Sequence, residues 1–215
     1  NWSTVNFSIS PINLFNISTC SNLTVADSIY YLNTSVNGTT TCMNVTANNI
    51  VLDCQNKIIN YSYTTIGGYG VLSNQNFTNI SNCVIIEGTT TTASKHAIYF
   101  TNNTGGVIYN NNITTRGATS NAIYLFRNSS NNTISNNLNI TTLGTGNVIY
   151  LFTDIHNNTI FNNVIKLVST GTGIYLSTRA KHNNITQNNI TSISSGTLIY
   201  LIQNADTNNI AYNNI

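Results

Sequence analysis

The chain repeats a short hydrophobic phrase at a nearly constant interval. Each copy has an apolar residue, a tyrosine and a second apolar residue, followed by a polar stretch rich in asparagine. The five copies are Ile98-Tyr99-Phe100, Ile123-Tyr124-Leu125, Ile149-Tyr150-Leu151, Ile174-Tyr175-Leu176 and Ile199-Tyr200-Leu201. Successive copies are 25, 26, 25 and 25 residues apart. A fixed period of this length is typical of a solenoid, in which each repeat packs on its neighbours.

Within each repeat the pattern predicts three short strands. Ile and Leu alternate with polar residues, β-branched residues are frequent, and Asn-rich or Gly-rich turns separate the runs. Helical repeats are excluded because they need long runs of good helix formers, and leucine-rich repeats need several more leucines per unit. The prediction is an all-β, single-stranded parallel β-helix, a β-solenoid with about 25 residues per coil.

Asparagine has a structural reason to be abundant in such a coil. At a corner between strands the chain turns sharply, and Asn adopts the left-handed backbone region more readily than other non-glycine residues. When coils stack roughly 4.8 Å apart, equivalent Asn side chains can bond to one another as a ladder. Charged residues are disfavoured in the same columns because like charges would face each other.

Two segments carry a resemblance to known proteins. The phrase GIYLSTRAKHNNITQNNI, at 173–190, resembles the right-handed parallel β-helix repeats of pectate-lyase-like proteins and of the periplasmic copper-site maturation family. The segment 19–59, with its Cys-flanked stretch and Leu-Asp-Cys turn, resembles the start of secreted archaeal and related microbial β-helix surface glycoproteins. The resemblance implies a right-handed coil and says little about function, because this fold hosts many activities.

The domain prediction follows from the repeat. Regular repeats cover 96–215, within a β-helix that spans 20–215 and is stapled by disulfides at 20–83. Residues 1–19 lie outside the repeat, and Val5, Phe7 and Ile9 alternate there as in a strand. We expect this strand to cap the first coil or to contact a neighbouring subunit.

Composition excludes nucleic acid as a partner. Only 6% of the residues are charged, and the seven Lys and Arg are scattered rather than clustered. Asn supplies 42 residues and Ser with Thr another 53, so neutral polar groups, or something attached to them, must keep the chain soluble. At 40% hydrophobic residues the chain has enough apolar surface for a continuous core.

The cysteines indicate a secreted protein, extracellular or at the cell surface. No run of about 18 apolar residues predicts a membrane span, and we expect that a leader has been removed before Asn1. The four cysteines form no zinc-type spacing, and free thiols are the less favoured alternative to disulfides. Their separations are near one coil length, which favours the pairs Cys20–Cys42 and Cys54–Cys83 over other pairings.

Sites for N-linked glycans are more frequent than chance predicts. Eighteen Asn-x-Ser/Thr sequons occur where the composition predicts about ten. The preference for Asn in turns and for Ile and Thr in the strands that follow would also generate some of them. The acceptors are Asn1, Asn6, Asn16, Asn22, Asn33, Asn37, Asn44, Asn60, Asn76, Asn79, Asn102, Asn112, Asn128, Asn131, Asn139, Asn157, Asn184 and Asn189. Strand alternation places acceptors such as Asn112 and Asn131 outward and their neighbours, such as Asn132, inward. We therefore expect a coat of glycans.

The repeated tyrosines form a candidate contact stripe. If the apolar residues of each phrase face inward, Tyr99, Tyr124, Tyr150, Tyr175 and Tyr200 face outward in one column. One interpretation is an aromatic stack that stabilises the sheet. The other is a contact surface for sugar rings, another subunit or the protein's own glycans.

Catalysis is not expected. The five acidic residues, Asp27, Asp53, Glu87, Asp154 and Asp206, occupy unrelated repeat positions and predict no carboxylate pair of the kind that glycosidases and lyases use. We expect the Asp53 side chain to stabilise a turn and Glu87 to be a solvent-exposed turn residue. Lysines such as Lys95 are expected to lie in solvent at the corners of the coil. The three histidines also fall at different repeat positions, so we expect no metal and no cofactor.

The function predicted from these patterns is structural. We expect an extracellular glycoprotein that self-associates head to tail or laterally, as a filament or surface-layer subunit, because the strand edges of a parallel β-helix need a cap or a partner. The alternative is a carbohydrate-binding adhesin or a non-catalytic, degenerate polysaccharide-processing domain.

Overall fold

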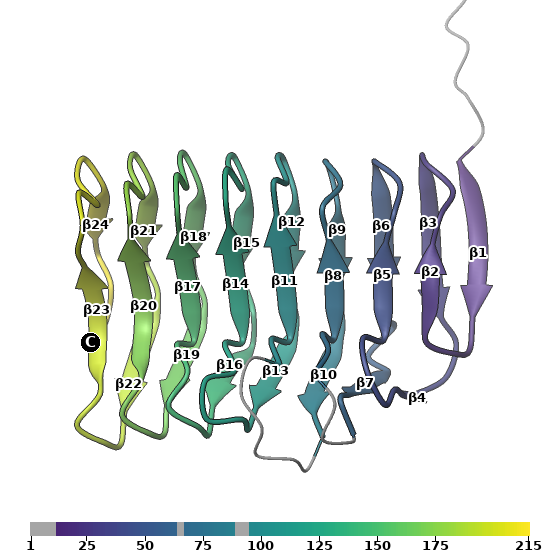
Figure 1. The fold of residues 1–215 in the computed structure, drawn as a ribbon, viewed down its shortest axis with the longest axis horizontal. Helices are drawn as coiled ribbons and strands as arrows, with labels where there is room; N and C mark the ends of the chain where they lie inside the picture. Colours follow the sequence, from purple (N-terminus) through teal and green to yellow (C-terminus); the bar gives the residue numbers. More distant parts are fainter. Residues whose placement is uncertain (1–11, 64–66, 89–94) are drawn as a thin grey trace, which may run out of the picture.

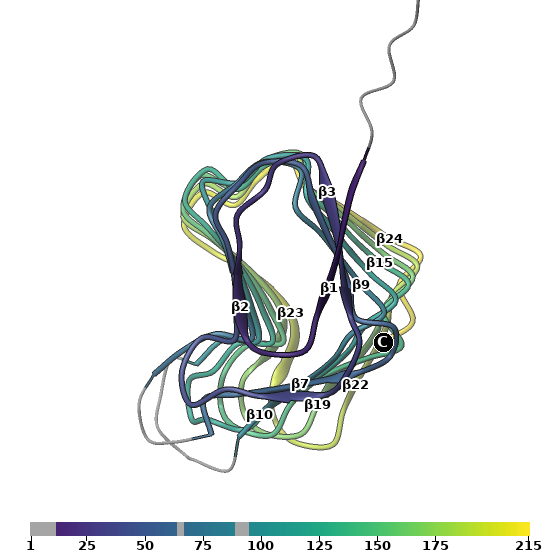
Figure 2. The same cartoon turned by 90° about the vertical axis from the view of Figure 1, so that its right-hand side faces the viewer.

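The protein is a parallel β-solenoid, with about seven turns and no helix among the residues that the structure describes. The computed structural model describes residues 12–63, 67–88 and 95–215. Figure 1 shows the coils side by side along the long axis, and Figure 2, a view along that axis, shows the three-sided cross-section. The predicted fold class, coil length and three strands per coil are confirmed.

Three parallel sheets form the sides, and each coil contributes one strand to each sheet in the order B, A, C. Sheet A contains β1 (Asn13–Ile17), β3 (Ser28–Leu32), β6 (Ile50–Asp53), β9 (Asn79–Ser81), β12 (Val107–Tyr109), β15 (Thr133–Ser135), β18 (Thr159–Phe161), β21 (Asn184–Thr186) and β24 (Asn209–Ala211). Sheet B contains β2 (Ser21–Leu23), β5 (Met43–Val45), β8 (Val71–Ser73), β11 (Ile98–Thr101), β14 (Ile123–Phe126), β17 (Ile149–Phe152), β20 (Thr172–Ser177) and β23 (Thr197–Leu201). Sheet C contains β4 (Val36–Asn37), β7 (Ile58–Tyr61), β10 (Val84–Glu87), β13 (Asn112–Thr115), β16 (Asn139–Thr142), β19 (Val164–Leu167) and β22 (Asn189–Ser192).

The core is a set of columns of identical residues. In sheet B, Ile123 pairs with Ile149, and the same position is Ile98 on the coil before and Ile174 on the coil after. All four side chains are fully buried, as are the equivalent isoleucines of sheets A and C in the central coils. Because the side-chain period of a strand is two, fixing one isoleucine inward fixes the direction of every neighbour.

The predicted extension 1–19 contributes to the sheets. Strand β1 pairs in parallel with β3, and Phe15 stacks on Tyr30 with ring centroids 4.8 Å apart. The predicted alternation of Val5, Phe7 and Ile9 lies outside the described residues. Sheet A therefore begins at Asn13 within the segment that the sequence pattern separated from the coils.

Left-handed backbone occurs at the same corners in successive coils. Of the 25 described non-glycine residues with positive φ, 11 are asparagines, as the corner argument predicts. One column lies two residues before the strands of sheet A and contains Asn131, Asn157, His182 and Thr207. Thr207 adopts the conformation although its β-branched side chain disfavours it, so the neighbouring coils impose the turn.

Buried asparagine ladders join the coils at these corners. In the ladder between sheets A and C, Asn137 donates through Nδ2 to Asn163 Oδ1 (2.8 Å) and to the carbonyl oxygen of Ile108 (3.1 Å), while its Oδ1 accepts from the backbone N–H of Asn111 (2.9 Å). The ladder contains Asn111, Asn137, Asn163, Asn188 and Asn213. A parallel ladder before sheet A contains Asn132, Asn158, Asn183 and Asn208.

A disulfide continues the first ladder toward the N-terminus. Cys83 stands at the ladder position of its coil, and its backbone N–H donates to Asn111 Oδ1 at 2.9 Å. Its sulfur is bonded to Cys54, and the second disulfide joins Cys20 to Cys42. Both predicted pairs are confirmed, with Cα–Cα distances of 4.4 and 4.7 Å.

The ladder predicts a sharp difference between two adjacent residues. Asn111→Ala removes the acceptor of the Cys83 N–H and the donor to the Ile80 carbonyl, so we expect unfolding to become easier by about 2–4 kcal/mol. Asn112→Ala, at the exposed neighbour, should cost less than about 1 kcal/mol. Urea denaturation of the two unglycosylated variants measures the difference, and equal losses would contradict the structural role of the ladder.

Candidate functional site

The five carboxylates are engaged in structural contacts. Asp154 Oδ1 pairs with Arg179 Nε at 2.6 Å, and Asp206 Oδ1 with Lys181 Nζ at 3.0 Å. Hydrogen bonding to Arg179 lowers the pKa of Asp154. Asp154 and Asp206 lie two coils apart, and each is paired with a cation of an adjacent coil.

The other two exposed or half-buried acids belong to turns. Asp53 Oδ1 accepts from the backbone N–H of Gln55 and from Asn82 Nδ2, both at 2.9 Å, so the predicted turn role of Asp53 is confirmed. Asp27 Oδ1 accepts from Asn49 Nδ2 at 2.7 Å. These contacts tie each carboxylate to a neighbouring coil.

The prediction that Glu87 and Lys95 are solvated is wrong. Glu87 is fully buried in β10, where it accepts from the backbone N–H groups of Arg116 (2.6 Å) and Gly117 (2.9 Å) and from Ser120 Oγ (3.0 Å). Burial raises the pKa of Glu87, and these hydrogen bonds with the charge of Lys95 oppose the rise. Lys95 is also buried. Strand alternation contained the signal, since Glu87 is two residues after the inward Ile85.

The described ranges contain no group of three or more His, Cys, Asp and Glu residues placed to hold a metal ion. They also contain no helix long and apolar enough to cross a membrane.

The predicted tyrosine column exists on the outer face of sheet B. Along the column the ring centroids of neighbouring tyrosines are 5.2, 5.0, 4.8 and 5.3 Å apart, from Tyr99 through Tyr124, Tyr150 and Tyr175 to Tyr200. The strands that carry these tyrosines face the viewer in Figure 1. Four of the rings are half-buried, and Tyr200 is 42% exposed.

Three further aromatic residues extend the stack and were not predicted. Tyr69 stacks on Tyr99 at 4.9 Å although its coil lacks the Ile-Tyr-Leu phrase, with Leu72 at the tyrosine position. Phe126 and Phe152 stack on each other at 5.8 Å, one step further along the outward face of β14 and β17. The signal for Phe126 and Phe152 was the same alternation that places the tyrosines outward.

The stack covers the flat faces of its own rings. The Tyr124 and Tyr150 planes differ by 6° and the Tyr150 and Tyr175 planes by 8°, so an interior ring has a neighbour on each face. Ring edges and hydroxyl groups are what remain for contact with other molecules. This geometry favours the interpretation of the column as a stabilising stack.

Burial and neighbouring rings also change the titration of this surface. Burial is the largest cause that raises the pKa of Tyr150 to about 12 and of Tyr124 still higher. His96 lies beside the column, with its ring 4.8 Å from that of Tyr124 and its Nδ1 accepting the Asn121 N–H at 3.0 Å. Burial lowers the pKa of His96 to about 4, so the imidazole is neutral near pH 7.

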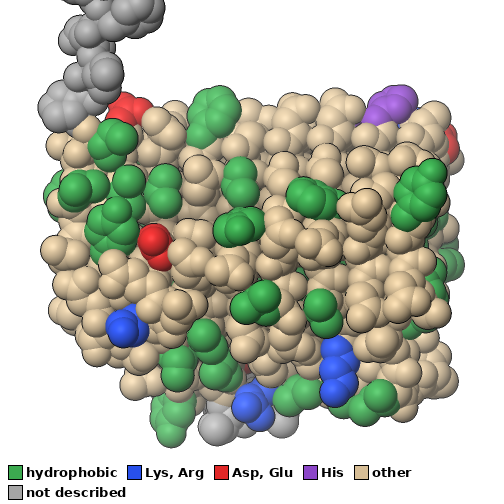
Figure 3. Space-filling model, turned by 180° about the vertical axis from the view of Figure 1, so that it is seen from behind, with side chains coloured by type: hydrophobic (Ala, Val, Ile, Leu, Met, Phe, Trp, Pro, Cys, Tyr) green, Lys and Arg blue, Asp and Glu red, His purple; other side chains and the backbone are tan. Residues whose placement is uncertain are grey.

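Each sequon asparagine that the structure describes is exposed or half-buried. Asn1 and Asn6 lie outside the described residues, and the other sixteen sequon asparagines are all accessible to some degree. None of the nine buried asparagines begins a sequon. These nine are Asn103, Asn111, Asn121, Asn132, Asn137, Asn158, Asn163, Asn183 and Asn188. Figure 3 shows one face of this surface, on which charged side chains are few and hydrophobic side chains are scattered among polar ones.

The fold and this surface define the class of protein: a disulfide-stapled parallel β-solenoid with a neutral, amide-rich exterior. No protein-family model, curated protein or solved structure matches the chain.

The stack predicts that an interior tyrosine matters more than an isolated one. Tyr150→Ala removes ring contacts on both faces, so we expect a loss of about 1–3 kcal/mol in unfolding free energy. The matched control is Tyr109→Ala on the outer face of sheet A, where the side chain is 44% exposed and the loss should stay below about 1 kcal/mol. A smaller loss for Tyr150→Ala than for Tyr109→Ala would argue against the stack.

His96 predicts a loss of stability in acid. The pKa of His96 is about 4 in the folded protein, below its ordinary value of 6.5, so the unfolded chain binds more protons between these pH values. Stability present above pH 6.5 is therefore lost as pH falls toward 4, by up to about 3 kcal/mol. Denaturation of wild type and His96→Phe between pH 7 and 4 tests this. The raised pKa of Glu87 has the opposite effect on the pH dependence of stability, but it is present in both proteins and cancels when the stability of the variant is subtracted from that of wild type. If both proteins lose stability equally as pH falls, His96 is not the cause of the loss.

Proposed function

We propose that the protein is an extracellular structural glycoprotein whose solenoid carries N-linked glycans on all three sides. The observation that carries the proposal is the separation of its asparagines: the sixteen described sequon acceptors lie at the surface, and the nine buried asparagines lie outside sequons. An oligosaccharide can be attached to each acceptor without unpacking the core.

Two further features support an extracellular location. Both cysteine pairs are disulfides, and such bonds persist mainly in oxidising compartments. Glycans would also supply the hydration that a surface with 6% charged residues lacks. The engagement of every carboxylate in turns, ion pairs or buried hydrogen bonds supports a non-catalytic role.

The glycoprotein proposal predicts a large mass increase. Expressed in a host with an N-glycosylation pathway, the chain should exceed its 23.4 kDa polypeptide mass by several glycans, and enzymatic deglycosylation should restore that mass. Glycopeptide mapping should find occupied sites among the sixteen described acceptors. A secreted, folded chain with the bare polypeptide mass would overturn the proposal.

Assembly into a filament or surface layer forms the second part of the proposal. Parallel sheets can extend by strand addition, so two solenoids can join end to end through strand edges. Electron microscopy of the glycosylated protein tests this part, because ordered arrays or filaments support it and discrete particles at high concentration contradict it.

The second candidate function is a carbohydrate-binding adhesin. The aromatic surface of sheet B is the feature that favours it, since ring edges and hydroxyl groups lie in a row along the outer face. Discrete particles that bind a glycan array would favour this candidate over the structural one.

A further inference from the structure

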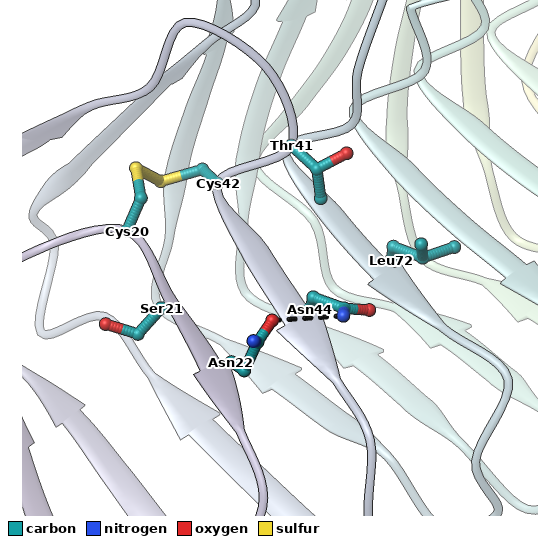
Figure 4. A pocket seen from close by; sticks show the side chains of 7 residues that line it. All are labelled: Cys20, Ser21, Asn22, Thr41, Cys42, Asn44 and Leu72. Carbon is teal, nitrogen blue, oxygen red and sulfur yellow. Dashed lines mark hydrogen bonds between the residues drawn. A yellow bond between two sulfur atoms is a disulfide. The ribbon is translucent and has the colours of Figure 1, made fainter.

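A hollow lies on the outer face of sheet B, next to the N-terminal end of the tyrosine column. It has a volume of about 310 Å³ and is bordered by residues of β2, β5 and β8 together with the Cys20–Cys42 disulfide (Figure 4). The side chains of Asn22, Asn44 and Leu72 line it. The disulfide joins two of its bordering segments and so limits their movement.

The hollow lies on the same line as the stacked rings. Strand register aligns Asn22 with Asn44, Asn44 with Leu72, and Leu72 with Tyr99, the first tyrosine of the repeated phrases. On the later coils this outward position holds a tyrosine ring. On the first two coils it holds an asparagine, so space that a ring fills elsewhere is open here.

The lining has the chemistry of a neutral sugar site. Amide and hydroxyl groups come from Asn22, Asn44, Ser21 and Thr41, and an aliphatic surface comes from Leu72. No ionisable side chain lines the hollow, since both of its cysteines are in the disulfide. A pyranose ring has matching features, because its edge carries hydroxyl groups and its face carries C–H groups.

Two of the lining residues are themselves predicted glycan acceptors. Asn22 and Asn44 both begin sequons, and Asn44 Nδ2 donates to Asn22 Oδ1 at 3.1 Å. A sugar bonded to Asn44 Nδ2 would therefore start inside the hollow, with Leu72 on the next coil toward the tyrosines. The second hydrogen of the Asn44 amide remains available to Asn22 after attachment.

We propose that this hollow seats one N-acetylhexosamine ring, supplied by the glycan on Asn44 or, in an unglycosylated chain, by an external saccharide. The assignment rests on the proposed glycoprotein function when the sugar comes from the Asn44 glycan, and it is independent of that function when the sugar is an external saccharide. The sugar packs its C–H face on Leu72 and prolongs the outward column of rings toward the first coil.

To test the glycan on Asn44, the threonine of its sequon is replaced, so that glycosylation is prevented while the asparagine side chain is kept. Thr46→Ala abolishes the Asn44 sequon, and Thr191→Ala, a matched exposed Thr→Ala change, abolishes the Asn189 sequon. In protein from a glycosylating host we expect Thr46→Ala to lower the melting temperature by about 2–4 °C, and Thr191→Ala by less than half as much. The effect of Thr46→Ala should shrink in a Leu72→Ala background, because the packing surface is then absent.

Two controls separate the sugar from the protein. The same variants made without glycosylation measure the cost of losing the hydroxyl alone, which for Thr46 includes its hydrogen bond to the Leu23 carbonyl at 3.2 Å. The sugar is credited only with the part of the Thr46→Ala loss that exceeds this cost, and equal losses in the two preparations would contradict its role. For the external source, unglycosylated protein with labelled leucine methyl groups is titrated with N,N′-diacetylchitobiose. A saturable shift of the Leu72 methyl signals, absent in Asn22→Ala/Asn44→Ala, supports the site.

The outcomes distinguish this inference from the proposed function. If Asn44 is unoccupied or its glycan leaves stability unchanged, and chitobiose also fails to shift Leu72, the sugar site is refuted even when other sequons carry glycans. If no sequon is occupied, the glycoprotein proposal fails, and the chitobiose titration alone decides the hollow. Stabilisation through Asn44 and Leu72, or specific chitobiose binding, supports the site and identifies its source.

Discussion

The fold depends on satisfying the backbone where the chain leaves one sheet for the next. Within a sheet every N–H and C=O can bond to an adjacent coil, but at a corner the strand pattern is interrupted and polar groups would be buried unpaired. At each such corner one buried asparagine side chain forms hydrogen bonds with the otherwise unpaired backbone groups. Asn163, for example, donates to a backbone carbonyl on one neighbouring coil and to an amide on the other, and accepts from the backbone of Asn137. Two such ladders connect the coils over the full regular repeat.

The same stacking explains the unusual composition. A residue placed in a column meets copies of itself about one strand spacing away, so neutral amides, hydroxyls and aromatic rings are favoured over like charges. Two pairs of opposite charge face each other across neighbouring regular coils, Asp154 with Arg179 and Lys181 with Asp206. Such exposed pairs contribute little to stability, but they avoid repulsion between coils. The neutral exterior and the absence of large charge fields thus follow from the architecture.

Repetition also decides how much the sequence alone could predict. Where the phrase recurs, the period sets the register, and alternation then orients Tyr124, Asn131 and Asn132 as the structure has them. The disulfide pairs were predictable for the same reason, because one coil length brings each pair to adjacent coils. Tyr69 was missed because it enters the column from a coil without the phrase, where Leu72 stands in register. Glu87 was misplaced because a charged residue beside glycine suggests a turn, while three donors from the next coil stabilise it inside.

Strand alternation also links the two roles of asparagine. A sequon needs a hydroxyl residue two positions after the asparagine, and in a strand those two side chains point the same way. For seven of the nine buried asparagines the residue at that position is a buried isoleucine at the inward face of the following strand, so no sequon forms there. An outward asparagine such as Asn112 or Asn189 is followed two positions later by a threonine that is accessible at the surface, Thr114 or Thr191. The core columns thus keep sequons out of the interior, and a coil can gain an acceptor on its surface without any change to the ladders that hold it together.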